Sequence, residues 1–394
     1  MDLSLLVLIV VVTALAFDFT NGFHDTANAM ATSIATGALK PKVAVTVAAI
    51  LNLVGAFLST EVAKTISGGL VNEAKITTAV IFGGLVGAIV WNLFTWLLGI
   101  PSSSSMALLG GLIGGVWIGS GASAVHFGAV ISKVLIPAFA SPVVAALVAA
   151  TATYLAYRIV RSARTASVNR GFRVGQTVSA SMVSLAHGTS DGQKTMGVIT
   201  LTLIASGSLH PGSGPPLWVI STCGLAIAAG TYVGGWRIIQ TMGHKLTVID
   251  PAQGFAAETT STVVLLVSSH AGFPLSTTQV SAGSILGAGL GRSDSQVRWG
   301  VAGRMVLAWL FTLPMAGLVG GVSARIANTG ALGVGAVATV LVAASVTMYL
   351  LNRRTAVTAA TVNDIDTFAP PAMPTPLPEQ PIVSLPRAED EQKV

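Results

Sequence analysis

The sequence has little charge and almost no cysteine. Only 9% of its 394 residues are Asp, Glu, Lys or Arg, whereas a soluble domain usually carries about 25%. Fifteen acids and twenty-one bases cannot cover the surface of one or two globular domains, so soluble enzymes and nucleic-acid-binding modules are excluded as the main interpretation. The single cysteine, Cys223, cannot form an internal disulfide, which also excludes a secreted disulfide scaffold.

Hydrophobic residues are abundant instead, at 52% of the chain, and the mean hydropathy is +0.75. They occur in runs of roughly 20 residues, the length that crosses a hydrocarbon core of about 30 Å. Bases gather at the ends of these runs, most densely between Arg158 and Arg173, as in cytoplasmic loops that face an anionic membrane surface. The net charge of +6 therefore needs no nucleic-acid partner. We predict a multi-pass protein of the cytoplasmic membrane, surrounded by lipid.

Two apolar stretches contain too much proline and glycine to be simple spanning helices. Residues 99–118 begin Gly-Ile-Pro-Ser-Ser-Ser-Ser and contain two Gly-Gly pairs, and residues 272–290 begin Gly-Phe-Pro-Leu-Ser-Thr-Thr. Such residues free backbone groups, which at membrane depth are tolerated only where protein or a water-filled cavity satisfies them. We therefore predict a re-entrant hairpin in each stretch.

The C-terminal end has a different composition. Residues 370–386 hold seven of the seventeen prolines, and residues 355–394 contain six acids against two bases. A segment of this composition cannot bury enough apolar surface to order itself. We predict that residues 353–394 form a disordered, acidic, proline-rich tail that contributes little to the fold.

The two halves of the chain share a pattern. Asp25 and Asp191 lie in similar motifs near the start of each half, and Pro101 and Pro274 each precede a group of hydroxyl residues. Each half has about five crossings and one hairpin, and an odd number of crossings makes the second half enter the membrane from the opposite side.

The resulting prediction is an all-α polytopic membrane protein built of two inverted-topology repeats. It has about ten spanning helices, two re-entrant hairpins and a broken first helix in each repeat. The segments are a first inverted repeat over 1–160, a basic cytoplasmic linker over 161–173, a second inverted repeat over 174–352, and the tail. Inverted repeats with helices broken at corresponding positions are typical of secondary transporters whose site lies near the midplane.

Four motifs in this order resemble the inorganic phosphate transporter (PiT) family, and the similarity covers about residues 15–325. Residues 21–29 (Asn-Gly-Phe-His-Asp-Thr-Ala-Asn-Ala) and 187–195 (His-Gly-Thr-Ser-Asp-Gly-Gln-Lys-Thr) resemble the tandem signature of that family. Residues 101–105 and 274–278 resemble its hairpin motifs, and residues 254–258 (Gly-Phe-Ala-Ala-Glu) a further element. The variant found here is similar to the bacterial low-affinity phosphate permease branch.

Several positions depart from the sodium-coupled members of that family. Lys194 stands where the second half would have Asn, and Asn52 stands where those members have Glu. Ser190 replaces the Asn before the second aspartate, and Met106 and Gln279 replace a His that often follows the hairpin hydroxyls. A fixed ammonium at Lys194, one turn after Asp191, would occupy the cation position of the second half. We therefore expect coupling to H⁺, with Na⁺ as the alternative.

The hairpin hydroxyls suit an oxyanion. Short hydroxyls and backbone N–H groups at half-helix N-termini can replace the water shell of phosphate without fixing a full positive charge there. Isolated Ser and Thr residues merely bond to helix carbonyls, but two matching triplets after proline are harder to explain in that way. The predicted substrate-binding residues are Ser103, Ser104, Ser105, Ser276, Thr277 and Thr278.

Carboxylates have the wrong sign to attract phosphate, so we interpret them as cation partners. An intramembrane acid is costly and marks a functional site by default. Glu258 is also compatible with a helix N-terminal acid, and His24 with a packing residue. Asp18, near the start of the chain, is expected at the membrane interface. The predicted ion- and proton-coupling residues are Asp25, Asn28, Asp191, Lys194, Glu258 and His24.

The resemblance implies a transporter and not an enzyme, without a cofactor or resident metal, that imports inorganic phosphate by symport. The phosphate enters free or with a divalent cation as a metal–phosphate complex. Coupling to sodium and transport of sulfate are alternatives within this class. The oligomeric state stays open, and a homo-oligomer is one option. The alternative from a different class is an intramembrane hydrolase, since Ser, His and Asp are all present. The sequence lacks, however, a Gly-x-Ser-x-Gly elbow and a His-Glu-x-x-His metal helix.

Overall fold

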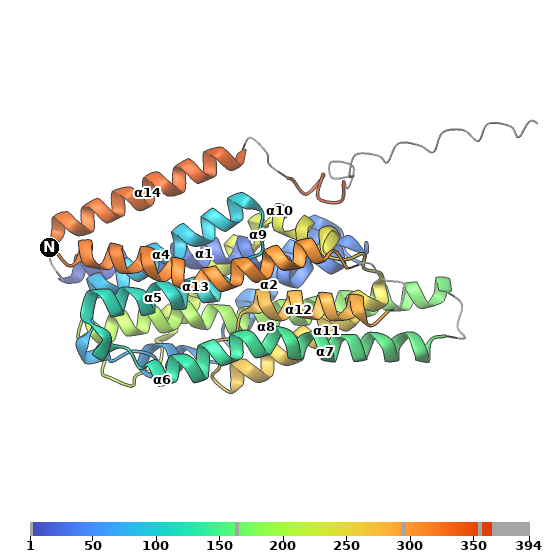
Figure 1. Cartoon of the computed structure of the whole chain (residues 1–394), viewed down its shortest axis with the longest axis horizontal. Helices are drawn as coiled ribbons and strands as arrows, with labels where there is room; N and C mark the ends of the chain where they lie inside the picture. Colours follow the sequence, from blue (N-terminus) through green and yellow to red (C-terminus); the bar gives the residue numbers. More distant parts are fainter. Residues whose placement is uncertain (1–2, 162–164, 293–296, 354–356, 365–394) are drawn as a thin grey trace, which may run out of the picture. The chain divides into compact units, whose positions relative to one another are not determined.

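The computed structural model describes residues 3–161, 165–292, 297–353 and 357–364. Residues 1–363 form one compact unit (Figure 1). Within the described residues the structure is helical; β-structure there is limited to two isolated bridges, Val71–Val125 and Thr247–Val297. The all-α prediction is therefore confirmed for this part of the chain.

Helical segments follow one another through both halves of the chain. The first half contains α1 (Leu3–Ala35), α2 (Pro41–Gly55), α3 (Glu61–Lys64), η1 (Thr65–Gly69), η2 (Glu73–Lys75), α4 (Thr78–Leu98), α5 (Ser104–Ser120), η3 (Ala122–Ala124), α6 (Phe127–Val130), η4 (Ile131–Leu135) and α7 (Ile136–Ile159). The second half contains α8 (Thr165–Ala205), α9 (Leu217–Val233), α10 (Trp236–Gln240), η5 (Thr241–Lys245), α11 (Pro251–His270), α12 (Thr277–Leu290), α13 (Trp299–Ala327) and α14 (Ala331–Arg353).

Several of these helices are long and apolar enough to cross a membrane. Among the described residues there are five, or six if α9 and α10–η5, which meet at a bend of 64°, are counted as one broken span. α8 and α11 are also long, but buried polar side chains dilute their apolar character. The chain is thus a multi-pass membrane protein, and the number of about ten spans stays a prediction.

The first helix of each half is continuous, which contradicts the prediction that it is broken. α1 and α8 run without interruption through both aspartate motifs. Their glycines allow close packing: an added Cβ would lie 2.3 Å from the carbonyl oxygen of Ile227 at Gly22, and 2.2 Å from that of Asn52 at Gly188. Neighbouring side chains satisfy the polar groups, so the backbone does not need to open at this depth.

Each of the two proline-containing stretches forms the tip and second limb of a hairpin, and the preceding helix is its first limb. Hairpin 1 consists of α4, residues 99–103 and α5; hairpin 2 consists of α11, residues 271–276 and α12. The Gly-Gly pairs do not break α5, because they admit α4: a Cβ at Gly111 would lie 2.2 Å from the carbonyl oxygen of Gly84. Gly99 ends α4 in the left-handed region, at φ 66°.

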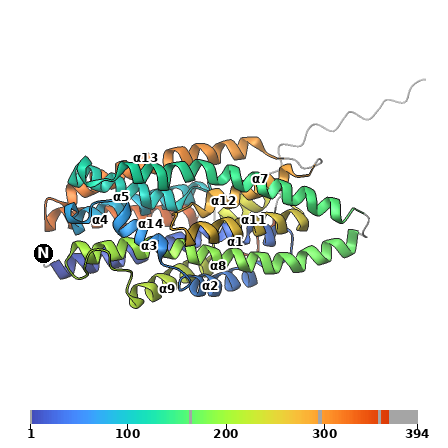
Figure 2. The same ribbon diagram turned by 90° about the horizontal axis from the view of Figure 1, so that it is seen from below.

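The two halves share part of their order of elements: a long helix, a shorter helix, a short helix followed by a π-helical segment, and a hairpin. α1 and α8 lie side by side and run in opposite directions (Figures 1 and 2). Two of the three π-helical segments among the described residues, η1 and η5, are followed two residues later by an isolated bridge, at Val71 and Thr247.

The two larger of three apolar clusters among the described residues leave a polar layer between them. On α1 the first cluster extends to Phe23 and the second begins at Ala27. On α8 the order is reversed: residues up to Val183 belong to the second cluster, and residues from Met196 onward belong to the first. The residues between these limits carry both aspartate motifs, so the apolar core places them in one layer.

The second cluster includes part of the segment that we assigned to the tail. Val362 is fully buried in it, Val357 packs against it, and the side chain of Asn363 bonds to His244 at 3.0 Å. Residues 357–363 therefore belong to the folded unit, because Val357 and Val362 pack in the second cluster. The rest of the predicted tail, residues 365–394, lies outside the described residues.

Candidate functional site

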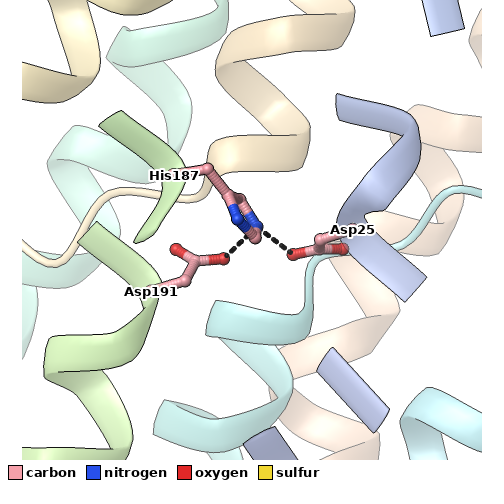
Figure 3. A group of neighbouring side chains, drawn as sticks. All are labelled: Asp25, His187 and Asp191. Carbon is pink, nitrogen blue, oxygen red and sulfur yellow. Dashed lines mark ion pairs between the residues drawn. The ribbon is translucent and has the colours of Figure 1, made fainter. Parts of the chain in front are cut away.

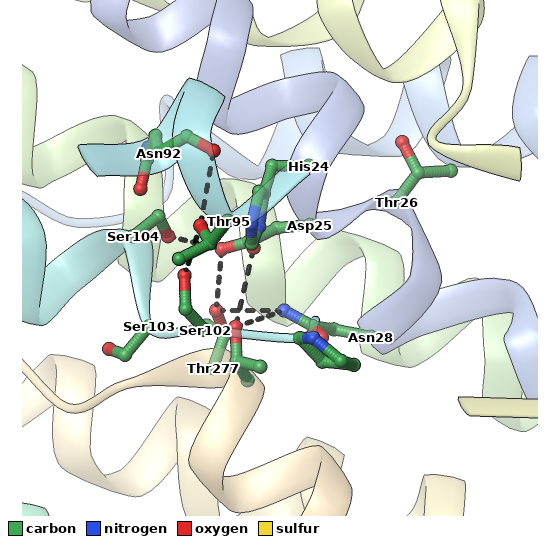
Figure 4. Close-up of polar contacts among 12 residues, drawn as sticks. His24, Asp25, Thr26, Asn28, Asn92, Thr95, Ser102, Ser103, Ser104 and Thr277 are labelled. Carbon is green, nitrogen blue, oxygen red and sulfur yellow. Dashed lines mark hydrogen bonds and ion pairs between the residues drawn. The ribbon is translucent and has the colours of Figure 1, made fainter. Parts of the chain in front are cut away.

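The polar layer brings together α1, α8 and the tips of both hairpins. Asp25 on α1 and Asp191 on α8 are both fully buried. The six hydroxyl residues predicted to bind substrate are buried as well, and they lie at the starts of α5 and α12. Residues separated by up to 253 positions in the sequence thus form one cluster (Figure 4).

Each hairpin tip ends in a capped helix N-terminus. The Ser103 hydroxyl accepts from the backbone N–H of Met106 at 3.0 Å, and the Ser276 hydroxyl accepts from that of Gln279 at 3.2 Å. Serine is favoured at this position because its oxygen satisfies a free N–H group of the first turn. Ser103 also donates to Ser276 at 2.7 Å, so the two caps touch.

The hydroxyls after these caps donate to the aspartates. Ser104 donates to Asp25 at 2.5 Å, and Thr278 donates to its other carboxylate oxygen at 3.3 Å. Thr277 reaches both acids, at 3.3 Å from Asp25 and 3.0 Å from Asp191. The hairpin hydroxyls predicted to bind substrate and the two aspartates predicted for ion coupling therefore belong to a single network.

His24 and Asn28 extend this network along α1. His24 Nδ1 lies 2.8 Å from Asp25, and its Nε2 lies 3.5 Å from the hydroxyl of Thr95. Asn28 donates to Thr277 at 3.3 Å and to Thr278 at 3.0 Å. His24 thus helps to hold Asp25 in position, and Asn28 helps to hold the hydroxyls that donate to it.

Lys194 is buried in the same layer, with 1% of its surface exposed. Its ammonium donates to Asp191 one turn earlier on α8, to Ser105 at 2.5 Å and to the carbonyl oxygen of Leu275 at 2.7 Å. A lysine has three donors, so these contacts use all of them. Lys194 therefore ties α8 to both hairpins and does not extend toward the membrane surface.

His187 has a central position that we did not assign to it from the sequence (Figure 3). Its Nε2 lies 3.1 Å from Asp191 and 4.0 Å from Asp25, and its Nδ1 lies 3.2 Å from the amide oxygen of Asn52. Both ring nitrogens thus face oxygen atoms that are able to accept a hydrogen bond. The sequence signal was its spacing of four residues from Asp191, which places both on one helix face.

Asp18 is the second residue that sequence reasoning missed. It is fully buried inside the protein and accepts a hydrogen bond from Thr195 at 2.5 Å. One turn separates Thr195 from Asp191 on α8, which places Asp18 beside the central layer and outside its hydroxyl network.

Glu258 does not join the central cluster, contrary to prediction. It accepts from Thr32, Ser33 and Ser179, each at 2.5 Å, and from Gln176 at 3.2 Å. Ser33 lies eight residues after Asp25, which is about 12 Å along a helix. The alternative of a helix N-terminal acid is wrong too, because α11 begins at Pro251. Glu258 thus forms a second polar cluster between α1, α8 and α11.

One carboxylate oxygen each of Asp25 and Asp191 and one ring nitrogen of His187 lie within 4.8 Å of one another. Carboxylate and imidazole ligands in such a group are able to hold a divalent cation such as Zn²⁺ or Mn²⁺. The hydroxyls of Ser104 and Thr277, which donate to the same two acids, are able to hold an oxyanion. The arrangement thus offers adjoining places for a cation and an anion.

Comparison with known proteins gives a consistent result. Residues 21–320 match the phosphate transporter family (PHO4). The chain is 58% identical over 362 residues to a probable low-affinity inorganic phosphate transporter of Mycobacterium leprae, covering 91% of this chain and 87% of that protein. It is 40% identical over 329 residues to one of Bacillus subtilis, covering 83% and 98%.

A solved structure has a similar fold. It is described as the sodium-dependent phosphate transporter, with a TM-score of 0.69 and 22% identity over 80% of this chain and 97% of that one. The family and the relatives are transporters and not enzymes. The chain therefore belongs to the phosphate transporter family.

Proposed function

We propose that this protein imports inorganic phosphate across the cytoplasmic membrane as a proton symporter. The observation that carries the proposal is the sharing of donors at the centre of the fold. Ser104, Thr277 and Thr278, which suit an oxyanion, donate to the Asp25 carboxylate. An acid and a phosphate would compete for the same hydroxyls.

This competition supplies a coupling mechanism. An ionised Asp25 repels phosphate and occupies the hydroxyls. A proton on Asp25 removes its charge and weakens its hold as an acceptor, so the hydroxyls rotate toward the oxyanion. Loss of the proton after translocation restores the competition and expels the phosphate. His24, 2.8 Å from Asp25, is placed to pass that proton.

Lys194 supports protons over sodium. Its ammonium already pairs with Asp191 and uses its remaining donors on Ser105 and Leu275. A sodium ion at this position would have to displace a buried, fully bonded cation. Asn52, where the sodium-coupled members have Glu, bonds to His187 and Thr231 and adds no charge.

We further propose that the two halves are inverted repeats that alternate access to the central site. The opposite directions of α1 and α8 and the matching hairpins support this arrangement (Figures 1 and 2). The basic segment between Arg158 and Arg173 favours a cytoplasmic position for the end of α7 and the start of α8. Glu258, nearer to that end, would receive the proton on the cytoplasmic side.

A second candidate substrate is a metal–phosphate complex. The convergence of Asp25, His187 and Asp191 favours it, because these ligands would face the divalent cation while the hydroxyls face the phosphate. Uptake of radiolabelled phosphate would then rise with added Mg²⁺ or Mn²⁺ and carry the metal in equal amount.

Uptake by purified protein in liposomes tests the main proposal. Radiolabelled phosphate should accumulate under an inward proton gradient, and replacing sodium by choline should change nothing. Sodium-dependent uptake at constant pH would refute proton coupling and leave the phosphate assignment standing. Equal accumulation of sulfate would refute the assignment of phosphate as the substrate. Hydrolysis without uptake would favour the alternative of an intramembrane hydrolase.

A further inference from the structure

A groove runs along α12, the second limb of hairpin 2, between α7 and α13, and we call it the lateral groove. Its volume is about 490 Å³, and apart from Gln279 and two tryptophans it is lined by apolar residues. On its α7 wall Phe139, Val143 and Leu147 have exposed fractions of 62%, 59% and 65%. Exposed apolar side chains gathered in this way mark a contact with membrane or protein. In a multi-pass membrane protein the groove therefore opens sideways into the bilayer.

Close packing of α7 on α12 forms the floor of the lateral groove. An added Cβ would lie 2.4 Å from the carbonyl oxygen of Pro142 at Gly283, and 2.0 Å from that of Ala146 at Gly287. The two helices thus touch along their backbones and lie side by side (Figures 1 and 2). Pro142, Ala146 and Gly283 also line the groove, so its floor consists of small residues while larger side chains form its walls.

The length of the lateral groove matches one leaflet of a bilayer. Its inner end lies at the first turns of α5 and α12, where Met106 and Gln279 line it. The backbone N–H groups of these two residues bond to Ser103 and Ser276 in the central layer. Its outer end is at Leu290, the last residue of α12, eleven positions after Gln279. Eleven residues extend about 16 Å along a helix, which is about half of a hydrocarbon core of 30 Å.

A tryptophan and an arginine mark the outer end. The start of α13 lies beside the end of α12, because the Val297 side chain would be 3.3 Å from a Cβ at Gly289. Trp299, the first residue of α13, lines the groove and is 64% exposed. Arg298 precedes it, is exposed, and takes part in none of the ion pairs among the described residues. Tryptophan is enriched at the level of the lipid headgroups, and arginine suits a phosphate group.

We propose that the lateral groove binds one acyl chain of an anionic phospholipid, with the headgroup phosphate at Arg298. The apolar lining does not suit the hydrated phosphate ion, because it would leave the ion without hydrogen-bond partners. A helix of a second copy is too wide, since over this length it has a diameter of about 10 Å and occupies on the order of 1,200 Å³, against the 490 Å³ of the groove. A single extended chain is thinner and has the length of a leaflet.

The selection of this lipid has a physical reason. The surrounding lipid tails are as apolar as the groove, so hydrophobic transfer alone does not hold a chain there. The fit of the chain against the walls and the attraction between Arg298 and an anionic headgroup supply the preference. The proposal does not depend on the transported ion or on its coupling.

Native mass spectrometry of the purified full-length protein tests the proposal by counting the lipids bound per chain. The protein is delipidated in detergent and then titrated with phosphatidylglycerol. Val143→Trp fills the groove from its wall, and we expect this variant to bind one phosphatidylglycerol fewer than the wild type. Val144→Trp serves as the matched control, because the adjacent Val144 is also exposed, at 49%, but does not line the groove. It should bind as many lipids as the wild type.

The headgroup contact has its own variant. Arg298→Gln should weaken the binding of phosphatidylglycerol about fivefold, the effect of removing one cation near a membrane surface, and should leave the binding of phosphatidylcholine unchanged. Arg325→Gln, which removes an exposed cation from the other end of α13, is the control and should change neither. Equal binding of phosphatidylglycerol by both variants would overturn the headgroup contact.

Equal lipid counts for the wild type and Val143→Trp would overturn the proposal. So would a Val143→Trp protein that loses a dimer mass and keeps every lipid, since the groove would then hold a second copy of the chain. If Val143→Trp unfolds on heating earlier than the wild type, Leu147→Trp replaces it, because Leu147 lines the same wall and is 65% exposed. The same loss of one lipid is expected of that variant.

Discussion

The ammonium of Lys194 donates to the carboxylate of Asp191 one turn earlier on the same face of α8, and both side chains are buried. Here the sodium-coupled members of the family would have an amide in place of the cation. Removing one partner of a buried ion pair destabilises a protein strongly, because the remaining buried charge has no partner. The pair therefore fixes the charge state of this half of the site.

Replacing Lys194 should change the coupling ion. In Lys194→Asn the carboxylate of Asp191 loses its cation, and a sodium ion with oxygen ligands from Ser105 and Leu275 would replace it. We expect proton-driven uptake to fall at least about tenfold and part of it to return on adding sodium. Liposome uptake with sodium or choline measures this, and Lys42→Gln serves as the control. A variant that transports like the wild type without sodium would contradict the role of Lys194.

Two glycines of α8 should respond in opposite directions to the same substitution. In Gly188→Ala the added Cβ would lie 2.2 Å from the carbonyl oxygen of Asn52, whereas Gly171 has no atom within 4 Å of that position. We expect Gly188→Ala to destabilise the protein by about 1–3 kcal/mol or more. Gly171→Ala should stabilise α8 by about 0.5–1 kcal/mol. Thermal unfolding in detergent gives both values, and equal melting temperatures would show that α2 does not pack tightly on α8.

Truncation of the C-terminus should have an effect that depends on where the chain is cut. Removal of residues 365–394 should leave uptake and melting temperature unchanged. Removal of residues 354–394 also takes away Val357 and Val362, which cover apolar side chains of the second cluster. We expect the shorter protein to melt at a lower temperature while still inserting into the membrane. Equal stability of both truncated proteins would show that this cover is dispensable.

The sequence predicted the local parts of the site because each has a short signal. Proline followed by Ser or Thr is a typical start of a helix, and both Ser103 and Ser276 are N-caps. Asp25 and Asp191 lie in similar motifs, and an aspartate that recurs in both halves is less plausibly an accident of packing than a single one. We expected the aspartate motifs and the hairpin tips to lie in one layer because the site of such transporters lies near the membrane midplane.

Other features depend on contacts that no local pattern records. Glycine reads as a helix breaker, yet Gly22 and Gly188 sit in continuous helices because another backbone touches them. His187 meets Asn52 across 135 residues of sequence, and Glu258 meets Ser33 across 225. The predicted position of Glu258 was wrong for this reason, because a family motif gives the type of a residue and does not give its contact partners.

The two aspartates should differ when each is replaced by asparagine. Asp25→Asn keeps the side-chain volume and imitates a protonated acid, so Ser104 and Thr278 remain free to bind phosphate. This variant should lose accumulation under a proton gradient and keep phosphate exchange between equal concentrations on both sides. Asp191→Asn instead leaves the buried ammonium of Lys194 without its carboxylate, which costs about 3–5 kcal/mol and should abolish both activities. Counterflow and gradient-driven uptake in the same liposomes separate these outcomes, and insertion is checked by the yield of folded protein. Gradient-driven accumulation by Asp25→Asn would remove Asp25 from the coupling mechanism, because asparagine cannot take up and release the coupled proton.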